Sequence, residues 1–464
     1  MKRFIIIALL LVLILVSCST IPAVTETEPP ETVTETEEKT EPLTETETET
    51  ETETETETAA ETETETETEP VTETEPEPET ETVTEAPKAT EKPQIKGYTL
   101  LEPGVTMIYG TCEDGAHITV TTSKTSYTAW SDGVNFAVSA PLATSGKNEI
   151  KLTAKADGKT ESGTASVIIK NDKNMDGKGL AVTLGSRVIE KRVLPDAYGT
   201  NTFSDGELKQ IRNAAEYRLS NAEKSAGKKV KTVYIIVPDP MTVYPEELTE
   251  EMKNNVVSGS ARLKQAKEAL SAVDGVIVID LTETLTENKE NGKLYYKLDS
   301  HWTELGALYG YIKVMETLGL SHYSLSDYSV EYKDIDDTDM NVYSGVGTGE
   351  MYESAPFLSA KFEEQTKYGR NKEDTARIWS YANQFFVGEY SKTVIKGSDK
   401  PTALFLSDSY GLNIIAYFAE SFGTFMTEPL WRYKADYDVV SDLKPDYIIE
   451  LLAERNLDEL LSST

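Results

Sequence analysis

The 464-residue chain contains few cysteines and histidines, and this scarcity limits the chemistry open to it. Its two cysteines are Cys18, in the N-terminal segment, and Cys112. If Cys18 is modified there, Cys112 has no partner for an intrachain disulfide, and the folded part must be held by burial alone. The three histidines form no Cys/His cluster with ligand spacing, so the sequence predicts no metal site and no cofactor.

Basic surface is also scarce. The formal net charge is −35, and residues 19–94 alone contain 26 glutamates and 3 lysines. The residues from 95 onward still carry a net charge of −14. A moderately acidic folded part without a basic stripe argues against nucleic acid as the partner.

Long apolar runs are missing after the N-terminus, where one such run follows Lys2 and Arg3. Phe4–Val16 is too short to span a bilayer comfortably and suits the core of a signal peptide. It leads into Leu-Val-Ser-Cys at 15–18, which resembles a bacterial lipobox. The resemblance implies that residues 1–18 are a lipoprotein signal peptide ending in a lipidated Cys18, which anchors the protein to the extracellular face of the bacterial cell membrane. A plain signal peptide or an uncleaved anchor is the alternative.

Residues 19–94 are a Thr-Glu repeat with scattered proline and almost no large apolar side chains. Such a segment cannot bury enough surface to offset its chain entropy, so we expect a disordered linker. Its like charges repel one another and extend it. It is either a bare spacer, which we favour, or a stalk whose threonines carry O-linked sugars.

Residues 95–170 are predicted to form a small all-β sandwich. Short runs rich in β-branched and aromatic residues are separated by turn signals such as Ser131-Asp132-Gly133. The segment resembles bacterial immunoglobulin-like modules, and the resemblance implies a spacer or a glycan binder. The predicted strands are Val105–Tyr109, His117–Thr121, Ser126–Trp130, Val134–Ser139, Glu149–Ala154 and Thr164–Ile169.

From residue 171 to 464 the pattern changes to alternating strands and helices. Apolar runs bounded by loop residues are typical of a mostly parallel sheet buried on both faces. The alternation predicts a three-layer α/β/α domain. The predicted strands are Thr232–Val237, Gly275–Ile279, Ala403–Leu406 and Tyr447–Leu452, and the helical stretches include Glu207–Ala226, Ala261–Val273 and Glu304–Leu318.

A first candidate for chemistry is the loop that contains Asp299 and His301, directly before a helix that Thr303 and Gly319 would cap. Because Asp299 and His301 are two residues apart, the carboxylate can accept a hydrogen bond from the imidazole. This bond would fix the tautomer of the imidazole and stabilise its charged form during proton transfer. Taken alone, such a pair is more often a surface loop or a core hydrogen bond.

The second candidate is Ser409, which follows the predicted strand Ala403–Leu406 and precedes the apolar helical stretch Leu412–Phe422. A sharp turn from strand to helix exposes the serine at the carboxyl end of the sheet. Its backbone N–H then lies near a helix N-terminus, where developing oxyanion charge is favoured. Alone this turn is more often a helix N-cap, but together with Asp299 and His301 it suggests a nucleophile and its base.

The motifs resemble those of a known family. Tyr295–Gly306 is similar to the Tyr-x-x-x-Asp-x-His-Trp-x-x-x-Gly motif of the DHHW family and of the alginate O-acetylation proteins, which have SGNH hydrolase-like domains. In the same chain order, Val237–Glu246 resembles an upstream Pro-x-Lys and Tyr-Pro-Glu segment, and Ser407–Tyr410 resembles the Gly-Asp-Ser-Phe nucleophile block. The closing Glu-Arg of the family matches Glu454 and Arg455.

This resemblance implies roles for individual residues. Ser409 matches the nucleophile, His301 the general base and Asp299 the residue that orients the base. Trp302, Tyr244 and Tyr410 are candidates for substrate binding, with a role in the core as the alternative for the first two. No residue here corresponds with certainty to the family's separate oxyanion donors; Gly345 and Gly347 are candidates. Two positions depart from the pattern, since Ser407 replaces the motif's glycine and Pro240 its lysine.

We therefore expect O-acyl transfer, in which Ser409 takes an acetyl group and passes it to a hydroxyl of a cell-surface or secreted polysaccharide. The choice of transferase rests on the resemblance, which also implies a membrane O-acyltransferase partner that supplies the acetyl groups. Two alternatives stay open. One is a carbohydrate esterase with the same triad and water as acceptor, and the other is a non-catalytic, cell-surface glycan-binding scaffold.

Overall fold

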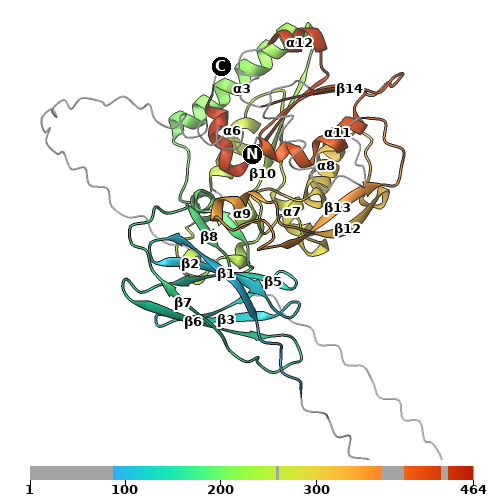
Figure 1. Cartoon of the computed structure of the whole chain (residues 1–464). Coiled ribbons are helices and arrows are strands. Elements are labelled where there is room, and N and C mark those ends of the chain that lie inside the picture. Colours follow the sequence, from blue (N-terminus) through green and yellow to red (C-terminus); the bar gives the residue numbers. More distant parts are fainter. Residues whose placement is uncertain (1–86, 258–260, 367–390, 430–436, 463–464) are drawn as a thin grey trace, which may run out of the picture. The chain divides into compact units, whose positions relative to one another are not determined.

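The structure is a computed structural model that describes residues 87–257, 261–366, 391–429 and 437–462 (Figure 1). The predicted signal peptide, Cys18 and the predicted linker up to residue 86 lie outside the described residues. Within the described ranges, no helix is long and apolar enough to cross a membrane. The described residues belong to one compact unit.

Two antiparallel sheets pack face to face at the start of the described chain. One has the strand order β1-β2-β5 and the other β4-β3-β6-β7. Their inner faces share one core, to which Ile108 and Phe136 contribute from the first sheet and Ile118 and Ile150 from the second. The strands are β1 (Gln94–Glu102), β2 (Val105–Thr111), β3 (His117–Thr121), β4 (Ser126–Trp130), β5 (Asn135–Pro141), β6 (Lys147–Lys155) and β7 (Ala165–Lys170).

The six strands predicted in this region are present, and β1 is an additional strand. The chain joins the sandwich before the predicted linker boundary at residue 94. Thr90 is buried, its backbone N–H donates to the Thr160 carbonyl at 2.9 Å, and its hydroxyl accepts the Ala156 N–H at 2.9 Å. Cys112 is a half-buried free cysteine beside the same core.

The second part of the described chain is built on a six-stranded sheet with the order β11-β10-β17-β15-β16-β14. Neighbouring strands are parallel except β14, which pairs antiparallel with β16. The strands are β10 (Lys231–Val237), β11 (Val276–Asp280), β14 (Ser391–Val394), β15 (Thr402–Ser407), β16 (Thr424–Pro429) and β17 (Tyr447–Ala453). Two hairpins stand apart from it, β8 (Leu180–Val182) with β9 (Val188–Glu190) and β12 (Tyr328–Ile335) with β13 (Glu353–Ala360).

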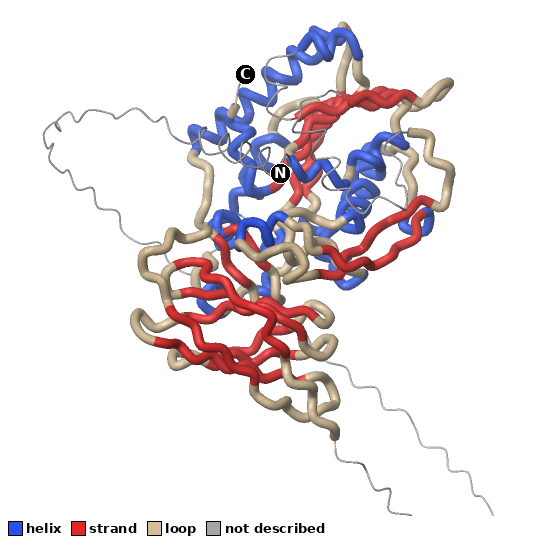
Figure 2. The backbone as a smooth tube through the Cα atoms, in the orientation of Figure 1, coloured by secondary structure: helices blue, strands red, loops and turns tan. Residues whose placement is uncertain are grey.

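Helices cover both faces of this sheet (Figure 2). Side chains of one strand alternate between the two cores: Val233 and Ile235 pack toward α8 and α11, whereas Tyr234 and Ile236 pack toward α3 and α6. The α-helices are α2 (Leu194–Tyr198), α3 (Asp205–Ala226), α4 (Pro240–Val243), α5 (Glu250–Lys253), α6 (Ala261–Ser271), α7 (Thr282–Asn288), α8 (Glu304–Leu318), α9 (Asp339–Ser344), α11 (Ile415–Ser421) and α12 (Tyr437–Leu443). The 3-10 helices are η1 (Lys191–Val193), η2 (Pro245–Glu247), η3 (Lys289–Asn291), η4 (Leu325–Asp327), η5 (Ser409–Asn413) and η7 (Glu454–Leu461).

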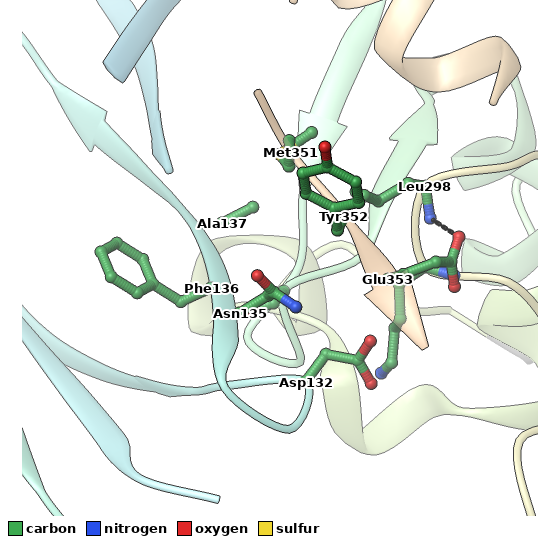
Figure 3. Close-up of a pocket in the computed structure, with 10 residues that line it drawn as sticks. Asp132, Asn135, Phe136, Ala137, Leu298, Met351, Tyr352 and Glu353 are labelled. Atoms are coloured by element: carbon green, nitrogen blue, oxygen red, sulfur yellow. Dashed lines mark hydrogen bonds between the residues drawn. The ribbon is translucent and has the colours of Figure 1, made fainter. Parts of the chain in front are cut away.

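The sandwich and the α/β part meet in a buried contact beneath the Asp299 loop. Lys293 donates to Asp132 at 2.6 Å, and the Trp130 N–H donates to the Leu184 carbonyl at 2.8 Å. A cavity of about 10 Å³, room for about one water, lies at this contact. Figure 3 shows its lining, with Asp132 and Phe136 on one side and Leu298 and Glu353 on the other. One apolar cluster spans both parts and includes Leu101, Met107, Tyr109, Ala137, Leu180, Val182, Val188, Leu298, Met340, Val346 and Met351.

Candidate active site

The candidate site lies at the carboxyl edge of the sheet, where parallel strands end side by side. β15 is a direct neighbour of β17, which in turn pairs with β10. Polar residues follow each strand: Ser409 after β15, Arg455 after β17 and Asp239 after β10. In open α/β sheets this edge is where ligands bind.

Ser409 is the first residue of η5 and is partly exposed. The turn that presents it is fixed by Asp408, which caps the helix. One carboxylate oxygen of Asp408 accepts the Tyr410 N–H at 2.9 Å, and the other accepts the Ala453 N–H at 2.8 Å and the Asn456 amide at 2.7 Å. The Gly411 N–H also donates to the Asp408 carbonyl at 3.1 Å, so among the first amides of η5 that of Ser409 is the one available as a donor.

His301 connects Ser409 to Asp299. Its Nε2 lies 2.8 Å from the Ser409 Oγ, and its Nδ1 lies 2.7 Å from the Asp299 Oδ1. The same Asp299 oxygen accepts the His301 backbone N–H at 3.0 Å, so the loop folds back on itself. Thr303 then begins α8 by accepting the Gly306 N–H at 3.2 Å, and Gly319 ends it with φ 67°, as predicted.

Each of Asp299 and His301 stabilises the charged form of the other. Burial raises the pKa of Asp299, but the charge and hydrogen bonds of His301 outweigh burial, and the pKa is lowered. Burial lowers the pKa of His301, but the Asp299 carboxylate outweighs burial, and the pKa is raised. The imidazole is therefore well suited to accept a proton from the Ser409 hydroxyl.

Two further carboxylates, absent from the predicted site, hold the loop. The buried Glu353 accepts the backbone N–H groups of Lys297 at 2.7 Å and Leu298 at 2.8 Å, the second of which is the dashed line in Figure 3. Asp339, at the start of α9, accepts the Ser300 N–H at 2.9 Å and its hydroxyl at 2.5 Å. Burial and the Asp299 charge raise the pKa of Asp339 to about 7. No sequence motif marks either residue.

A buried ion pair supports the site from below. Arg455 donates to Asp239 at 2.7 Å and to the Tyr410 hydroxyl at 2.8 Å, and its second terminal nitrogen donates to the Ser300 carbonyl at 3.1 Å. These contacts give Arg455 the surroundings of a structural ion-pair partner. It links the ends of β10, β15 and β17 to the loop that bears His301.

The three aromatic candidates for substrate binding differ in exposure. Trp302 and Tyr410 are fully buried, and the Trp302 indole N–H donates to the Tyr410 carbonyl at 2.8 Å. Side chains without exposed surface cannot touch a bound ligand, so burial favours the core alternative for Trp302 and argues against the substrate contact predicted for Tyr410. Tyr244 is partly exposed, and its ring packs against the Arg187 guanidinium at 4.8 Å. Of the two glycines considered for oxyanion binding, Gly345 already donates its N–H to the Val342 carbonyl at 3.1 Å.

Asp299, His301 and Asp339 also form a group whose possible metal-ligand atoms lie within 4.8 Å of one another. These atoms already bond to each other, to Ser300 and to Ser409. We therefore assign no metal to this group.

Comparison with known proteins identifies part of the chain. Residues 205–340 match the family model described as "SGNH hydrolase-like domain, acetyltransferase AlgX". These residues are similar to an SGNH hydrolase-like domain. The match includes Asp299 and His301 and ends before Ser409. It confirms, for these residues, the predicted resemblance to the alginate O-acetylation proteins.

Individual relatives are distant. A "Probable alginate O-acetylase AlgJ" of Pseudomonas syringae pv. tomato is 29% identical over 112 residues, which span 23% of this chain and 28% of that relative. A DHHW family protein from Eubacterium siraeum superimposes with a TM-score of 0.43 at 15% identity, covering 67% of this chain and 94% of the other. Bacillus cereus PatB1 with a sulfonyl adduct superimposes with a TM-score of 0.46 at 17% identity, covering 61% of this chain and 98% of the other.

In the segment that resembles the nucleophile block, Ser407 stands in place of the motif's glycine, and the structure shows the consequence. Ser407 is fully buried, and among the described residues its hydroxyl has no hydrogen-bond partner. The hydroxyl also lies where a Cβ on Gly411 would come within 2.0 Å of it, so the two residues are in close contact. A buried hydroxyl without a partner destabilises the fold.

We predict that Ser407→Ala raises the free energy of unfolding by about 1 kcal/mol, because it removes that hydroxyl and leaves the backbone unchanged. Urea denaturation of the two proteins measures the difference. A lower stability of the alanine variant would mean that the hydroxyl has a partner, such as a buried water.

Proposed function

We propose that this protein transfers acetyl groups to hydroxyls of a polysaccharide, with Ser409 as nucleophile, His301 as general base and Asp299 as the residue that orients the base. The observation that carries the proposal is the chain of contacts from the Ser409 Oγ through both ring nitrogens of His301 to Asp299, at 2.8 and 2.7 Å. Ser409 and His301 are partly exposed, and Asp299 is buried, as this division of roles requires.

The first half-reaction would form an acetyl-enzyme. The Ser409 hydroxyl gives its proton to the His301 Nε2 while its oxygen bonds to the carbonyl carbon of the donor ester. The tetrahedral intermediate carries negative charge on the former carbonyl oxygen, for which the free N–H of Ser409 is the proposed donor. The bond to the donor oxygen then breaks, and His301 returns the proton to that oxygen, which leaves as an alcohol.

The second half-reaction would reverse these steps with a new alcohol. A sugar hydroxyl gives its proton to His301 and attacks the acetyl carbon. The bond to the Ser409 oxygen breaks, and that oxygen takes the proton back. Water in place of the sugar would make the same site an esterase, so the acceptor decides between the two reactions.

The choice of transferase and of a polysaccharide rests on what the relatives are named for, an alginate O-acetylase and the acetyltransferase AlgX. We infer further that a membrane O-acyltransferase supplies the acetyl groups, because a protein outside the cell has no acetyl-CoA. Tyr244 remains the proposed contact to substrate. For Trp302 and Tyr410 we propose positioning of the His301 loop instead.

We also infer the arrangement of the whole chain: a lipoprotein signal peptide in residues 1–18, a lipid on Cys18, and a disordered linker that carries an immunoglobulin-like sandwich and a catalytic domain beginning near residue 171. The supporting observations are the lipobox-like 15–18, the Thr-Glu repeat and the two-sheet β-sandwich. Mass spectrometry of the N-terminal peptide from membranes tests the lipid, and an unmodified Cys18 would refute it.

Covalent labelling tests the proposed nucleophile. Residues 87–464 are incubated with an aryl sulfonyl fluoride, and intact mass and peptide mapping locate the adduct. We expect one adduct on Ser409, formed at least about 100-fold more slowly in His301→Ala, because an isolated hydroxyl is a poor nucleophile. A folded protein that is not labelled, or is labelled equally in His301→Ala, would contradict an activated Ser409.

A further inference from the structure

Asp339 lies against the His301 loop, although about forty residues separate them in the sequence. Its two carboxylate oxygens bond to the N–H and the hydroxyl of Ser300, at 2.9 and 2.5 Å. The next residue of α9 adds a further contact, since the Met340 N–H donates to the Leu298 carbonyl at 3.1 Å. The short helix α9 therefore hydrogen-bonds to Leu298 and Ser300, the residues on either side of Asp299.

The same carboxylate is close to the imidazole. An Asp339 oxygen lies 4.0 Å from the His301 Nδ1, the nitrogen that Asp299 binds at 2.7 Å. Both side chains are largely withdrawn from water, with exposed fractions of 13% for His301 and 18% for Asp339. Two carboxylates therefore face one ring nitrogen from different elements of the fold.

We propose that Asp339 is a positioning residue of the site, which fixes the Ser300 turn and adds a second negative charge that sets the basicity of His301. When ionised, above its own pKa of about 7, Asp339 favours the imidazolium and opposes the loss of a proton from His301. Because the Asp299 charge also acts on Asp339, the two carboxylates and the imidazole titrate as a linked group rather than singly.

The other charged or titratable groups near His301 do not replace this charge. Arg455, from η7, acts on His301 in the opposite sense and lowers its pKa. The Tyr410 ring packs against the imidazole at 5.2 Å, with its own pKa raised by burial. On α9 itself, burial and the Asp339 charge raise the pKa of Tyr343, so this phenol is neutral at neutral pH. Asp339 is thus the second anion that faces His301 among the described residues.

The test is a direct titration of His301 by NMR of protein with labelled imidazoles. The chain has three histidines, so the His301 signal is the one lost in His301→Gln. Asp339→Asn keeps the shape and can still accept the Ser300 N–H, but it carries no charge. Asp334→Asn removes an exposed acid from the preceding strand and is the matched control. Ser300→Ala removes the hydroxyl contact and leaves both charges in place.

We expect Asp339→Asn to move the His301 titration to lower pH by on the order of one pH unit, as for a charge removed at 4 Å in a water-like medium. Asp334→Asn and Ser300→Ala should move it much less. If Asp339→Asn folds and leaves the His301 titration where it was, the charge role is refuted. If Asp339→Asn does not fold, Ser300→Ala decides: a shift as large as one pH unit there would refute the charge role and assign the effect to the hydrogen bond.

The effect of this shift on catalysis rests on the function proposed above. The NMR titration of His301 can be measured whether or not the protein transfers acetyl groups. In an active protein, the acid limb of the pH–rate profile should move to lower pH in Asp339→Asn together with the NMR titration. A protein without acetyl transfer or labelling would refute the proposed function, and the NMR result on His301 would still decide the role of Asp339.

Discussion

Replacing Ser409 with alanine is expected to lower acetyl transfer by about 10⁴- to 10⁶-fold, the loss seen when the nucleophile of a serine triad is removed. The His301 Nε2, now 2.8 Å from the Ser409 Oγ, would have no hydroxyl to deprotonate, and no acetyl-enzyme could form. The measurement is transfer of labelled acetyl from an activated ester to oligosaccharides, with free acetate counted in parallel. The ratio of acetylated sugar to acetate in the native protein separates transferase from esterase.

Ser407→Ala is the matched control for this experiment. It removes a hydroxyl two residues away on the same turn, one that is buried and does not contact His301. It should keep most of the activity. If Ser409→Ala were as active as Ser407→Ala, Ser409 would not be the nucleophile, and a glycan-binding scaffold would become the better reading of the site.

Changing Asp299 to asparagine is expected to lower the rate by about 10⁴-fold, with little change in stability. The amide can still bond to the His301 Nδ1, but it favours the tautomer in which Nε2 carries the proton, and that nitrogen must instead accept one from Ser409. The loss of the carboxylate also removes the charge that raises the pKa of His301.

The pH dependence shows whether the Asp299 effect acts through His301. A general base works only when unprotonated, so native activity should fall as pH drops through the raised pKa of His301. In Asp299→Asn the residual activity should persist to lower pH. If the rate of Asp299→Asn were much lower but still fell over the same acid pH range as in the native protein, that fall would reflect the titration of a group other than His301.

The sequence predicted β10, β11, β15 and β17 of the six-stranded sheet and missed β14 and β16. β10, β15 and β17 are buried on both faces, and such strands appear as continuous apolar runs. β16 (Thr424–Pro429) mixes polar and apolar residues without a regular period. β12, outside this sheet, was also missed, although Tyr328, Val330 and Tyr332 alternate with polar residues. β1 escaped prediction because Lys96 and Gly97 interrupt its alternation at the end of a charged segment.

Some residues of the candidate site could be predicted from the sequence and others could not. Asp299, His301 and Ser409 stand in local motifs, and the structure brings them within hydrogen-bond distance, while their catalytic role stays a prediction. Asp339 and Glu353 could not be found, because a carboxylate in a polar segment looks like any surface acid. Only the tertiary contacts with Ser300 and Leu298 distinguish them.

The contact between the sandwich and the α/β part bears on how this protein can evolve or be recombined. Lys293 bonds to Asp132, and an apolar cluster with members from both parts lies at the join. The β-sandwich contributes side chains to the contact beneath the Asp299 loop, so replacing it with an unrelated domain would require compensating changes in the α/β part. The two halves are thus expected to be inherited together, as one piece.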